Sequence, residues 1–177
     1  MALAIATIGI IGIFCVAGYY IVQAATSITI DENELYAVRE VKDGDTFTAM
    51  VGRHEITVRM LGIDTPETVD PRKPEQCYGK EASDKTKEVL TGKMVRLKLN
   101  PDREEKDRYG RYLAFVYSGE VFLNKLLLDE GYAREYTYGK SYMYRNEFRE
   151  VEGRAKEAGK GLWGVCAAPD YKLLKSV

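Results

Sequence analysis

Hydrophobic residues recur at every second position in three short stretches near the start of the charged part of the chain. Such alternation is the pattern of β-strands with one face buried. The stretches are Tyr36–Val41, Phe47–Val51 and Glu55–Ile63, and Gly44 and Gly52 mark the turns between them. Three strands joined by turns this short predict a β-meander.

The second half of the chain alternates between helical and strand patterns. Helices are expected at about residues 79–90, 122–130 and 144–158, and strands at about 95–99 and 111–117. In the last helix Phe148, Val151, Ala155 and Ala158 are three or four positions apart, which predicts one buried face. These elements favour an α+β fold, a small five-stranded β-barrel of oligonucleotide-binding (OB-fold) type with three α-helices. An open α+β sheet is the alternative.

The N-terminal segment has a different composition, with no charged side chain in the first 30 residues. The apolar run 2–22 is long enough to span a bilayer as a hydrophobic helix. We therefore expect a signal-anchor or transmembrane segment at 1–25, a spacer at 26–34, the folded domain at 35–168 and a tail at 169–177. The domain would then be extracytoplasmic, either membrane-anchored or secreted, and we expect it to be a monomer.

The charge, histidine and cysteine content limit the kinds of binding and catalysis expected of the chain. With 26 basic and 27 acidic side chains, the chain does not have the net charge of a protein that holds nucleic acid by bulk attraction. The single histidine, His54, is predicted in a turn, so chemistry that relies on histidine is not expected. Cys77 and Cys166 form an even pair in the folded part and could join as a disulfide if the domain is exported. Two unrelated buried thiols are the alternative.

A strand end and a rigid turn carry the first candidate functional residues. Arg59, Asp64 and Glu67 lie within nine residues, and Pro66 restricts the turn between the two carboxylates. The arrangement can place one cation and two carboxylates around a small volume. A surface strand could carry the same charges without any function.

Asp45 and Arg111 extend this group from other parts of the chain. If the second and third strands are neighbours, Asp45 and Asp64 approach each other at one end of the barrel. Two carboxylates without histidine or cysteine favour an ion of the Ca2+ or Mg2+ class. Arg59 and Arg111 suit a phosphodiester, because a guanidinium group matches two phosphate oxygens. Ordinary turn chemistry for Asp45 and surface ion pairs for the arginines are the alternatives.

Three motifs in this order resemble the staphylococcal nuclease (thermonuclease) family. They are Val41-Lys42-Asp43-Gly44-Asp45-Thr46, Arg59-Met60-Leu61-Gly62-Ile63-Asp64-Thr65-Pro66-Glu67-Thr68 and Asp107-Arg108-Tyr109-Gly110-Arg111. The similarity covers about residues 36–164 and includes Gly161-Leu162-Trp163. The resemblance implies a five-stranded barrel with three helices that hydrolyses DNA and RNA with Ca2+.

The resemblance also implies a role for each matching residue. Asp45 and Asp64 would bind Ca2+ with the Thr65 carbonyl, Arg59 and Arg111 would hold the scissile phosphate, and Glu67 would act as general base or orient the attacking water. Tyr109 would contact the nucleotide, with Tyr136 and Tyr138 forming the wall of its pocket. Placing these last two tyrosines there requires a gap of one residue after Ala133. Cys77 and Cys166 have no counterpart in the family's cysteine-free founding member.

The leading hypothesis is therefore an exported, Ca2+-dependent nuclease with little sequence specificity. A catalytically silent nucleic-acid-binding or protein-binding barrel is the second hypothesis. It does not require Asp45, Arg59, Asp64, Glu67 and Arg111 together, and their joint presence weighs against it. A purely structural membrane-anchored domain is the third.

Overall fold

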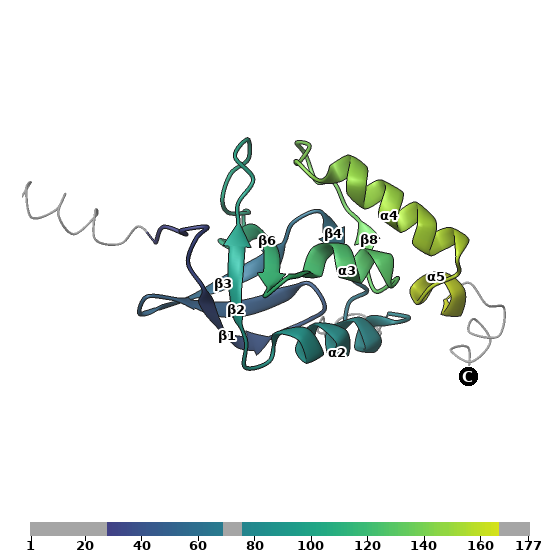
Figure 1. Cartoon of the computed structure of the whole chain (residues 1–177), viewed down its shortest axis with the longest axis horizontal. Helices are drawn as coiled ribbons and strands as arrows, with labels where there is room; N and C mark the ends of the chain where they lie inside the picture. Colours follow the sequence, from purple (N-terminus) through teal and green to yellow (C-terminus); the bar gives the residue numbers. More distant parts are fainter. Residues whose placement is uncertain (1–27, 69–75, 167–177) are drawn as a thin grey trace, which may run out of the picture.

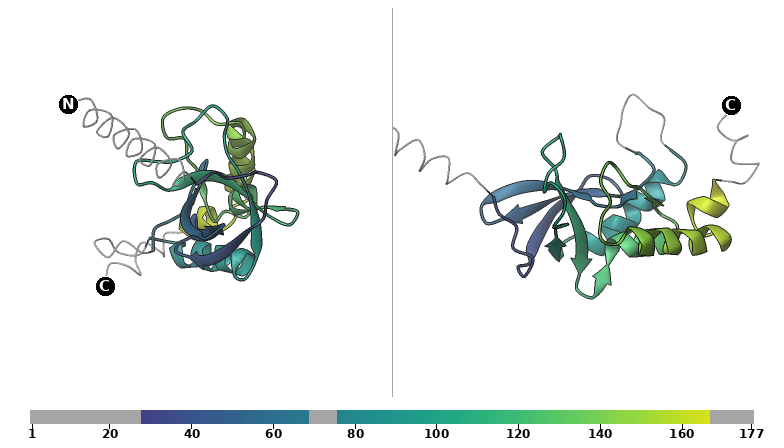
Figure 2. Two further views of the ribbon diagram at one scale, coloured as in Figure 1. Left: turned by 90° about the vertical axis from the view of Figure 1, so that its left-hand side faces the viewer. Right: turned by 90° about the horizontal axis from the view of Figure 1, so that it is seen from above.

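A closed barrel of five strands forms the centre of the molecule. The computed structural model describes residues 28–68 and 76–166. The strands are β1 (Tyr36–Val41), β2 (Thr46–Val51), β3 (His54–Met60), β5 (Met94–Lys98) and β6 (Tyr112–Ser118). Neighbours pair in the order β3-β2-β1-β5-β6, and a parallel pairing of β3 with β6 closes the ring (Figures 1 and 2). The predicted five-stranded barrel is confirmed, and the open sheet is excluded.

Helices cover one end and one side of this barrel. They are α2 (Gly79–Leu90), α3 (Leu123–Asp129), α4 (Arg145–Glu157) and the short α5 (Leu162–Val165). The three predicted helices are present, and α4 and α5 lie farthest from β1 in Figure 1. Three two-residue strands complete the fold: β4 (Ile63–Asp64), β7 (Val121–Phe122) and β8 (Arg134–Glu135). The sequence pattern did not predict β8.

The hydrophobic core follows the predicted alternation. Phe47, Val58 and Leu97 on the strands and Phe115 on β6 are fully buried. On α4 the residues Phe148, Val151 and Ala155 are buried, as the helical spacing predicted. Ala158 is exposed, because α4 ends at Glu157 and the buried stripe stops one turn earlier than expected.

The segment before β1 packs on the barrel. Ile30 is buried, the Tyr112 hydroxyl donates to the Ile28 carbonyl at 2.8 Å, and the Leu99 amide donates to a Glu32 carboxylate oxygen at 2.9 Å. The described part of the predicted spacer, residues 28–34, therefore packs against the domain. The predicted hydrophobic segment 1–25 and the predicted tail 169–177 lie outside the described residues. No helix within 28–68 or 76–166 is both long and apolar enough to cross a bilayer.

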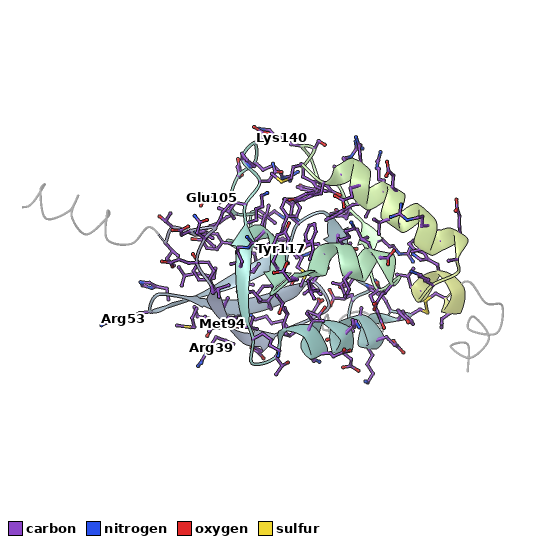
Figure 3. All side chains as sticks on the ribbon, in the orientation of Figure 1. Arg39, Arg53, Met94, Glu105, Tyr117 and Lys140 are labelled. Atoms are coloured by element: carbon purple, nitrogen blue, oxygen red, sulfur yellow. A yellow bond between two sulfur atoms is a disulfide. The ribbon has the colours of Figure 1, made fainter. Side chains whose placement is uncertain are left out.

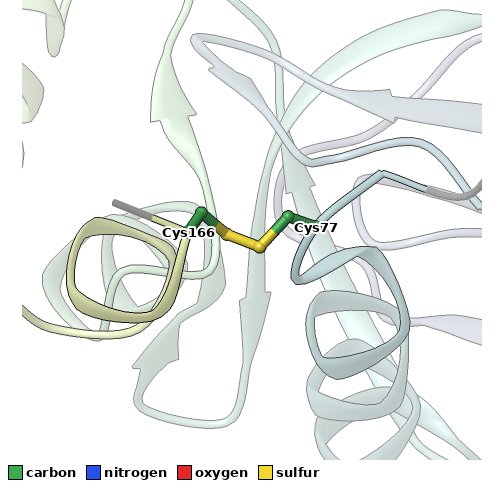
Figure 4. The surroundings of a disulfide bond; sticks show 2 residues. All are labelled: Cys77 and Cys166. Carbon is green, nitrogen blue, oxygen red and sulfur yellow. A yellow bond between two sulfur atoms is a disulfide. The ribbon is translucent and has the colours of Figure 1, made fainter. Parts of the chain in front are cut away.

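A disulfide joins two ends of helices that are far apart in sequence. Cys77 precedes α2, Cys166 follows α5, and their Cα atoms are 5.9 Å apart (Figure 4). The bond closes a loop of 89 residues. It attaches the C-terminal helices to the segment that follows the Glu67 turn.

Candidate active site

The turn between β3 and β4 is fixed by contacts from distant segments. Gly62 has φ of 82°, and the Tyr142 ring packs so closely on it that an added Cβ would lie 2.7 Å from ring carbons. The fully buried Asn124 donates from Nδ2 to the Leu61 carbonyl at 2.9 Å and accepts from the Val116 amide at 2.8 Å. β4 then pairs with β8, with Asp64 opposite Arg134. Tertiary contacts therefore set the direction in which the backbone continues from β3 to Asp64.

A second turn brings Asp45 to the same place. Gly44 lies against Thr65, and a Cβ on Gly44 would be 2.7 Å from the Thr65 hydroxyl oxygen. The Thr65 amide donates to Oδ2 of Asp45 at 2.9 Å, and the Thr46 hydroxyl donates to its Oδ1 at 2.9 Å. These contacts join the turn before β2 to the turn after β4, and a larger residue than glycine would separate them.

Arg59 joins the two carboxylates. Its Nη2 lies 3.0 Å from Oδ2 of Asp45 and 2.8 Å from Oδ1 of Asp64, so both oxygens converge on one nitrogen. Its Nη1 donates to the Met60 and Ile63 carbonyls, each at 2.8 Å. The Asp45 carboxylate is buried, whereas the Asp64 side chain is 52% exposed. One side of the group is therefore open to an incoming ligand.

The carboxylates repel each other in this partly buried space. Burial, and then the neighbouring Asp45 carboxylate, raise the pKa of Asp43 to about 6. Burial also raises the pKa of Asp64, although the charge of Arg59 opposes the shift. Arg59 thus pairs with Asp45 and Asp64 while the carboxylate of Asp43 lies close to that of Asp45, an arrangement that a further cation would relieve.

The donor set fits a hard divalent cation with open coordination positions. Asp45 and Asp64 offer carboxylate oxygens and no softer ligand, which suits Ca2+ or Mg2+. The described part of the chain contains no group of three or more His, Cys, Asp or Glu side chains placed to hold a metal ion. Any ion here would therefore depend on two carboxylates, backbone carbonyls, water and substrate.

A cavity of about 450 Å³ lies beside this group. It is lined by Arg59 and Arg111, by the turn 60–63, and by two loops that contain Tyr109 and the pair Tyr136 and Tyr138. The loops lie at the end of the molecule marked by Glu105 and Lys140 in Figure 3, away from Arg39 and Arg53. All three tyrosines are substantially exposed. The structure thus brings both arginines and the three predicted tyrosines into one cavity.

Arg111 is held in place by a residue of its own motif. Its Nε and Nη2 each lie 2.7 Å from Oδ2 of Asp107, and its amide donates to Oδ1 of Asp107 at 3.0 Å. Burial acts to raise the pKa of Asp107, but the hydrogen bonds from Arg111 and from the Tyr109 amide, together with the Arg111 charge, outweigh it and the pKa is lowered. Asp107 was not among the predicted site residues, although it stands four positions before Arg111.

Glu67 lies in the turn after Asp64 and does not line the cavity. Its backbone is held by Gln76: the Glu67 amide donates to Oε1 of Gln76 at 3.1 Å, and its carbonyl accepts from the Gln76 amide at 3.0 Å. The Glu67 charge acts to raise the pKa of both Asp43 and Asp64, so its carboxylate is near the group. Gln76 adjoins the disulfide residue Cys77, and sequence patterns gave no sign of this support.

Comparison with known proteins decides the family. The model for staphylococcal nuclease homologues matches residues 57–165. The chain belongs to the staphylococcal nuclease family.

Relatives support the same assignment across most of the chain. The thermonuclease of Staphylococcus hyicus is 44% identical over 130 residues, which are 73% of this chain and 76% of that protein. The thermonuclease of Staphylococcus intermedius is 42% identical over 137 residues, 77% of this chain and 80% of that protein. Endonuclease YncB of Bacillus subtilis (strain 168) is 37% identical over 122 residues, 68% of this chain and 57% of that protein. The chain is therefore a nuclease, and its substrate is nucleic acid.

Proposed function

We propose that this nuclease is a Ca2+-dependent phosphodiesterase that hydrolyses DNA and RNA with little sequence specificity. The observation that carries the proposal is the position of the cavity. Arg59 and Arg111 both line this cavity, and Arg59 also contacts Asp45 and Asp64, which supports the proposal. A phosphate bound there would meet two guanidinium groups and two metal-type carboxylates.

Asp45, Asp64 and the Thr65 carbonyl are the residues that would hold the ion. When bound, Ca2+ would supply positive charge that stabilises the anionic transition state of phosphodiester hydrolysis. Asp45 is preorganised for this role, since two hydrogen bonds from Thr65 and Thr46 fix its carboxylate. Asp64 is the more accessible ligand, on the side of the group that faces solvent.

The two arginines would bind the scissile phosphate and the charge that grows on it. Asp107, which also lines the cavity, binds the Arg111 guanidinium and would orient it before substrate arrives. Nη2 of Arg59 contacts both carboxylates here, and its N–H groups would become available to a phosphate oxygen when Asp45 and Asp64 bind the ion instead. Removing one such preorganised donor typically costs about 10²–10³ in rate.

Glu67 would act as general base or orient the attacking water. It follows Pro66, and its backbone hydrogen bonds to Gln76 limit movement of the turn. A carboxylate can accept a proton from water or fix its direction when it lies within hydrogen-bonding reach.

The tyrosines account for the proposed substrate range. Tyr109, Tyr136 and Tyr138 expose aromatic surface on which any base can stack, which favours single strands and gives little base readout. No part of this arrangement requires or forbids a 2′-hydroxyl group, so both DNA and RNA are proposed as substrates.

We further propose that the domain works outside the cytoplasm as a monomer, secreted or attached to a membrane by its N-terminal apolar segment. The apolar run 2–22 supports export. The disulfide between Cys77 and Cys166 supports it independently, since such bonds persist in oxidising compartments.

A hydrolysis assay on purified protein tests the proposed activity. Single-stranded DNA, double-stranded DNA and RNA are each incubated with the protein in Ca2+, in Mg2+ and in chelator. The proposal predicts cleavage of all three with Ca2+, fastest for the single strands, and no cleavage in chelator. Binding of nucleic acid without cleavage under every condition would instead support the silent binding module.

A further inference from the structure

The segment Arg134–Tyr138 presents different side chains on its two faces. Tyr136 and Tyr138 are exposed and line the cavity, whereas Glu135 and Thr137, which alternate with them along the chain, are partly buried. This alternation is what an extended chain produces. The side chains of the two partly buried residues therefore point to the opposite side of this segment from the two tyrosines that line the cavity.

Glu135 is a carboxylate with little access to water, since its side chain is 9% exposed. Its Oε1 accepts hydrogen bonds from the Thr137 hydroxyl and, at 2.9 Å, from the Tyr142 hydroxyl. Its Oε2 lies 3.3 Å from Nε of Arg149 on α4. A buried charge is retained at low cost only when several donors satisfy it, and the nuclease chemistry described above makes no use of this one.

The donors around Glu135 connect three parts of the molecule. Nε of Arg145 on α4 donates to the Thr137 hydroxyl at 3.1 Å. The Tyr142 hydroxyl is also 3.2 Å from the Gly62 carbonyl, in the turn that leads to Asp64. The Tyr136 amide donates to the same Gly62 carbonyl at 3.1 Å. The tyrosine wall, helix α4 and the catalytic turn thus meet at one carboxylate.

We propose that Glu135 and Thr137 are positioning residues that hold the Tyr136–Tyr138 wall at a fixed distance from the catalytic turn and thereby set the affinity for single-stranded nucleic acid. Neither residue lines the cavity. Their effect passes through the tyrosines, whose stacking contributes only if the rings are already in place. This inference rests on the proposed function, because it assumes that the cavity binds a nucleotide.

Thr137→Val is the most discriminating variant. Valine keeps the shape of threonine and removes only the hydroxyl that links Glu135 to Arg145. Thr57→Val is the matched control, because Thr57 is a half-buried threonine on β3 that does not line the cavity. Glu135→Gln is a second variant, which keeps the shape of the side chain and removes its charge.

Two measurements separate positioning from a purely structural role. Binding of a short fluorescent oligothymidylate is measured by anisotropy in chelator, and kcat and KM for single-stranded DNA are measured with Ca2+. We expect Thr137→Val and Glu135→Gln to raise both Kd and KM by about tenfold, which corresponds to part of the energy of stacking one base. We expect kcat to change by less than about threefold, and Thr57→Val to match the unmodified protein in every measurement.

The outcomes of this experiment are distinguishable. If the unmodified protein binds the oligonucleotide and Thr137→Val binds it equally well, the positioning role is wrong and the proposed function stands. If the two variants had a lower melting temperature but unchanged Kd and KM, Glu135 and Thr137 would have only a structural role and the inference would be wrong. A fall in kcat at constant KM would also overturn the inference. If the unmodified protein neither binds nor cleaves nucleic acid, the proposed function falls and this inference falls with it.

Discussion

The disulfide between Cys77 and Cys166 gives the prediction whose magnitude is most directly fixed by the fold. The perturbation is reduction of the bond or the double substitution Cys77→Ser, Cys166→Ser. Opening a loop of 89 residues frees the unfolded chain, which in the chain-entropy model costs the folded state about 4–5 kcal/mol. For a domain of this size that change lowers the melting temperature by roughly 10–20 °C.

Trp163 provides the assay, because it is the single tryptophan of the chain and lies in α5, next to the bond. Its indole ring is flanked by Arg134 and Lys156, at 4.9 and 4.5 Å from the ring centre, so its fluorescence should report release of α5. Unfolding in guanidinium chloride is followed with and without reductant. We expect the midpoint to fall on reduction, and the double serine variant to show the lower midpoint whether or not reductant is present.

Reduction should also lower activity, since Cys77 adjoins Gln76, which holds the backbone of Glu67. The loss should appear in kcat and should be smaller than the loss caused by removing a catalytic residue. Equal unfolding midpoints for the oxidised and reduced protein, or free thiols at both Cys77 and Cys166 in the purified oxidised domain, would refute this reasoning.

Three further predictions concern the site and its supports. Arg59→Lys keeps the charge but loses the guanidinium fork, and should lower turnover about 10²–10³-fold while the protein remains folded. Gly62→Ala should cost about 2–4 kcal/mol in the free energy of unfolding, because φ is 82° and the new Cβ would meet the Tyr142 ring. The lowered pKa of Asp107 implies a stabilisation that is present at neutral pH and is lost as pH falls below the ordinary aspartate range. Asp107→Asn, which cannot ionise, should therefore show a shallower loss of melting temperature on acidification than the unmodified protein.

The controls follow from the same structure. Arg39→Lys changes an exposed arginine far from the cavity and should leave turnover unchanged (Figure 3). Near-normal turnover of Arg59→Lys would argue against a phosphate clamp. A fully stable Gly62→Ala would show that Tyr142 can move away from the turn. If the melting temperatures of the unmodified protein and Asp107→Asn fell equally on acidification, protonation of Asp107 would not contribute to the loss of stability in acid.

The barrel could be predicted from sequence because its strands show local alternation. Tyr36–Val41 and Thr46–Val51 pair across a short turn, and the burial of Phe47 and Ala49 follows from spacing alone. Closure of the ring could not be predicted in the same way. It depends on a parallel pairing of β3 with β6, in which Val58 lies opposite Tyr112.

For the site, too, local features could be predicted from the sequence and long-range contacts could not. The order of the charged residues in the chain indicated which side chains belong together, but not how they are held. β8 is only Arg134–Glu135, two charged residues without a strand pattern, and it exists because β4 lies beside it. The burial of Glu135 and the hydrogen bonds by which Asn124 supports the turn likewise arise from long-range packing, which local sequence patterns do not predict.

The dependence of hydrolysis on Ca2+ in the unmodified protein and in Asp64→Asn tests the central claim most directly. Asp64 suits the test, because its side chain is 52% exposed and its substitution disturbs the buried Asp45 contacts least. Initial rates on single-stranded DNA are measured as Ca2+ is raised from chelated buffer. The account predicts no rate in chelator, a saturable rise for the unmodified protein, and a much weaker response at far higher Ca2+ for Asp64→Asn. Hydrolysis that persists in chelator, or the same Ca2+ response in both proteins, would contradict it.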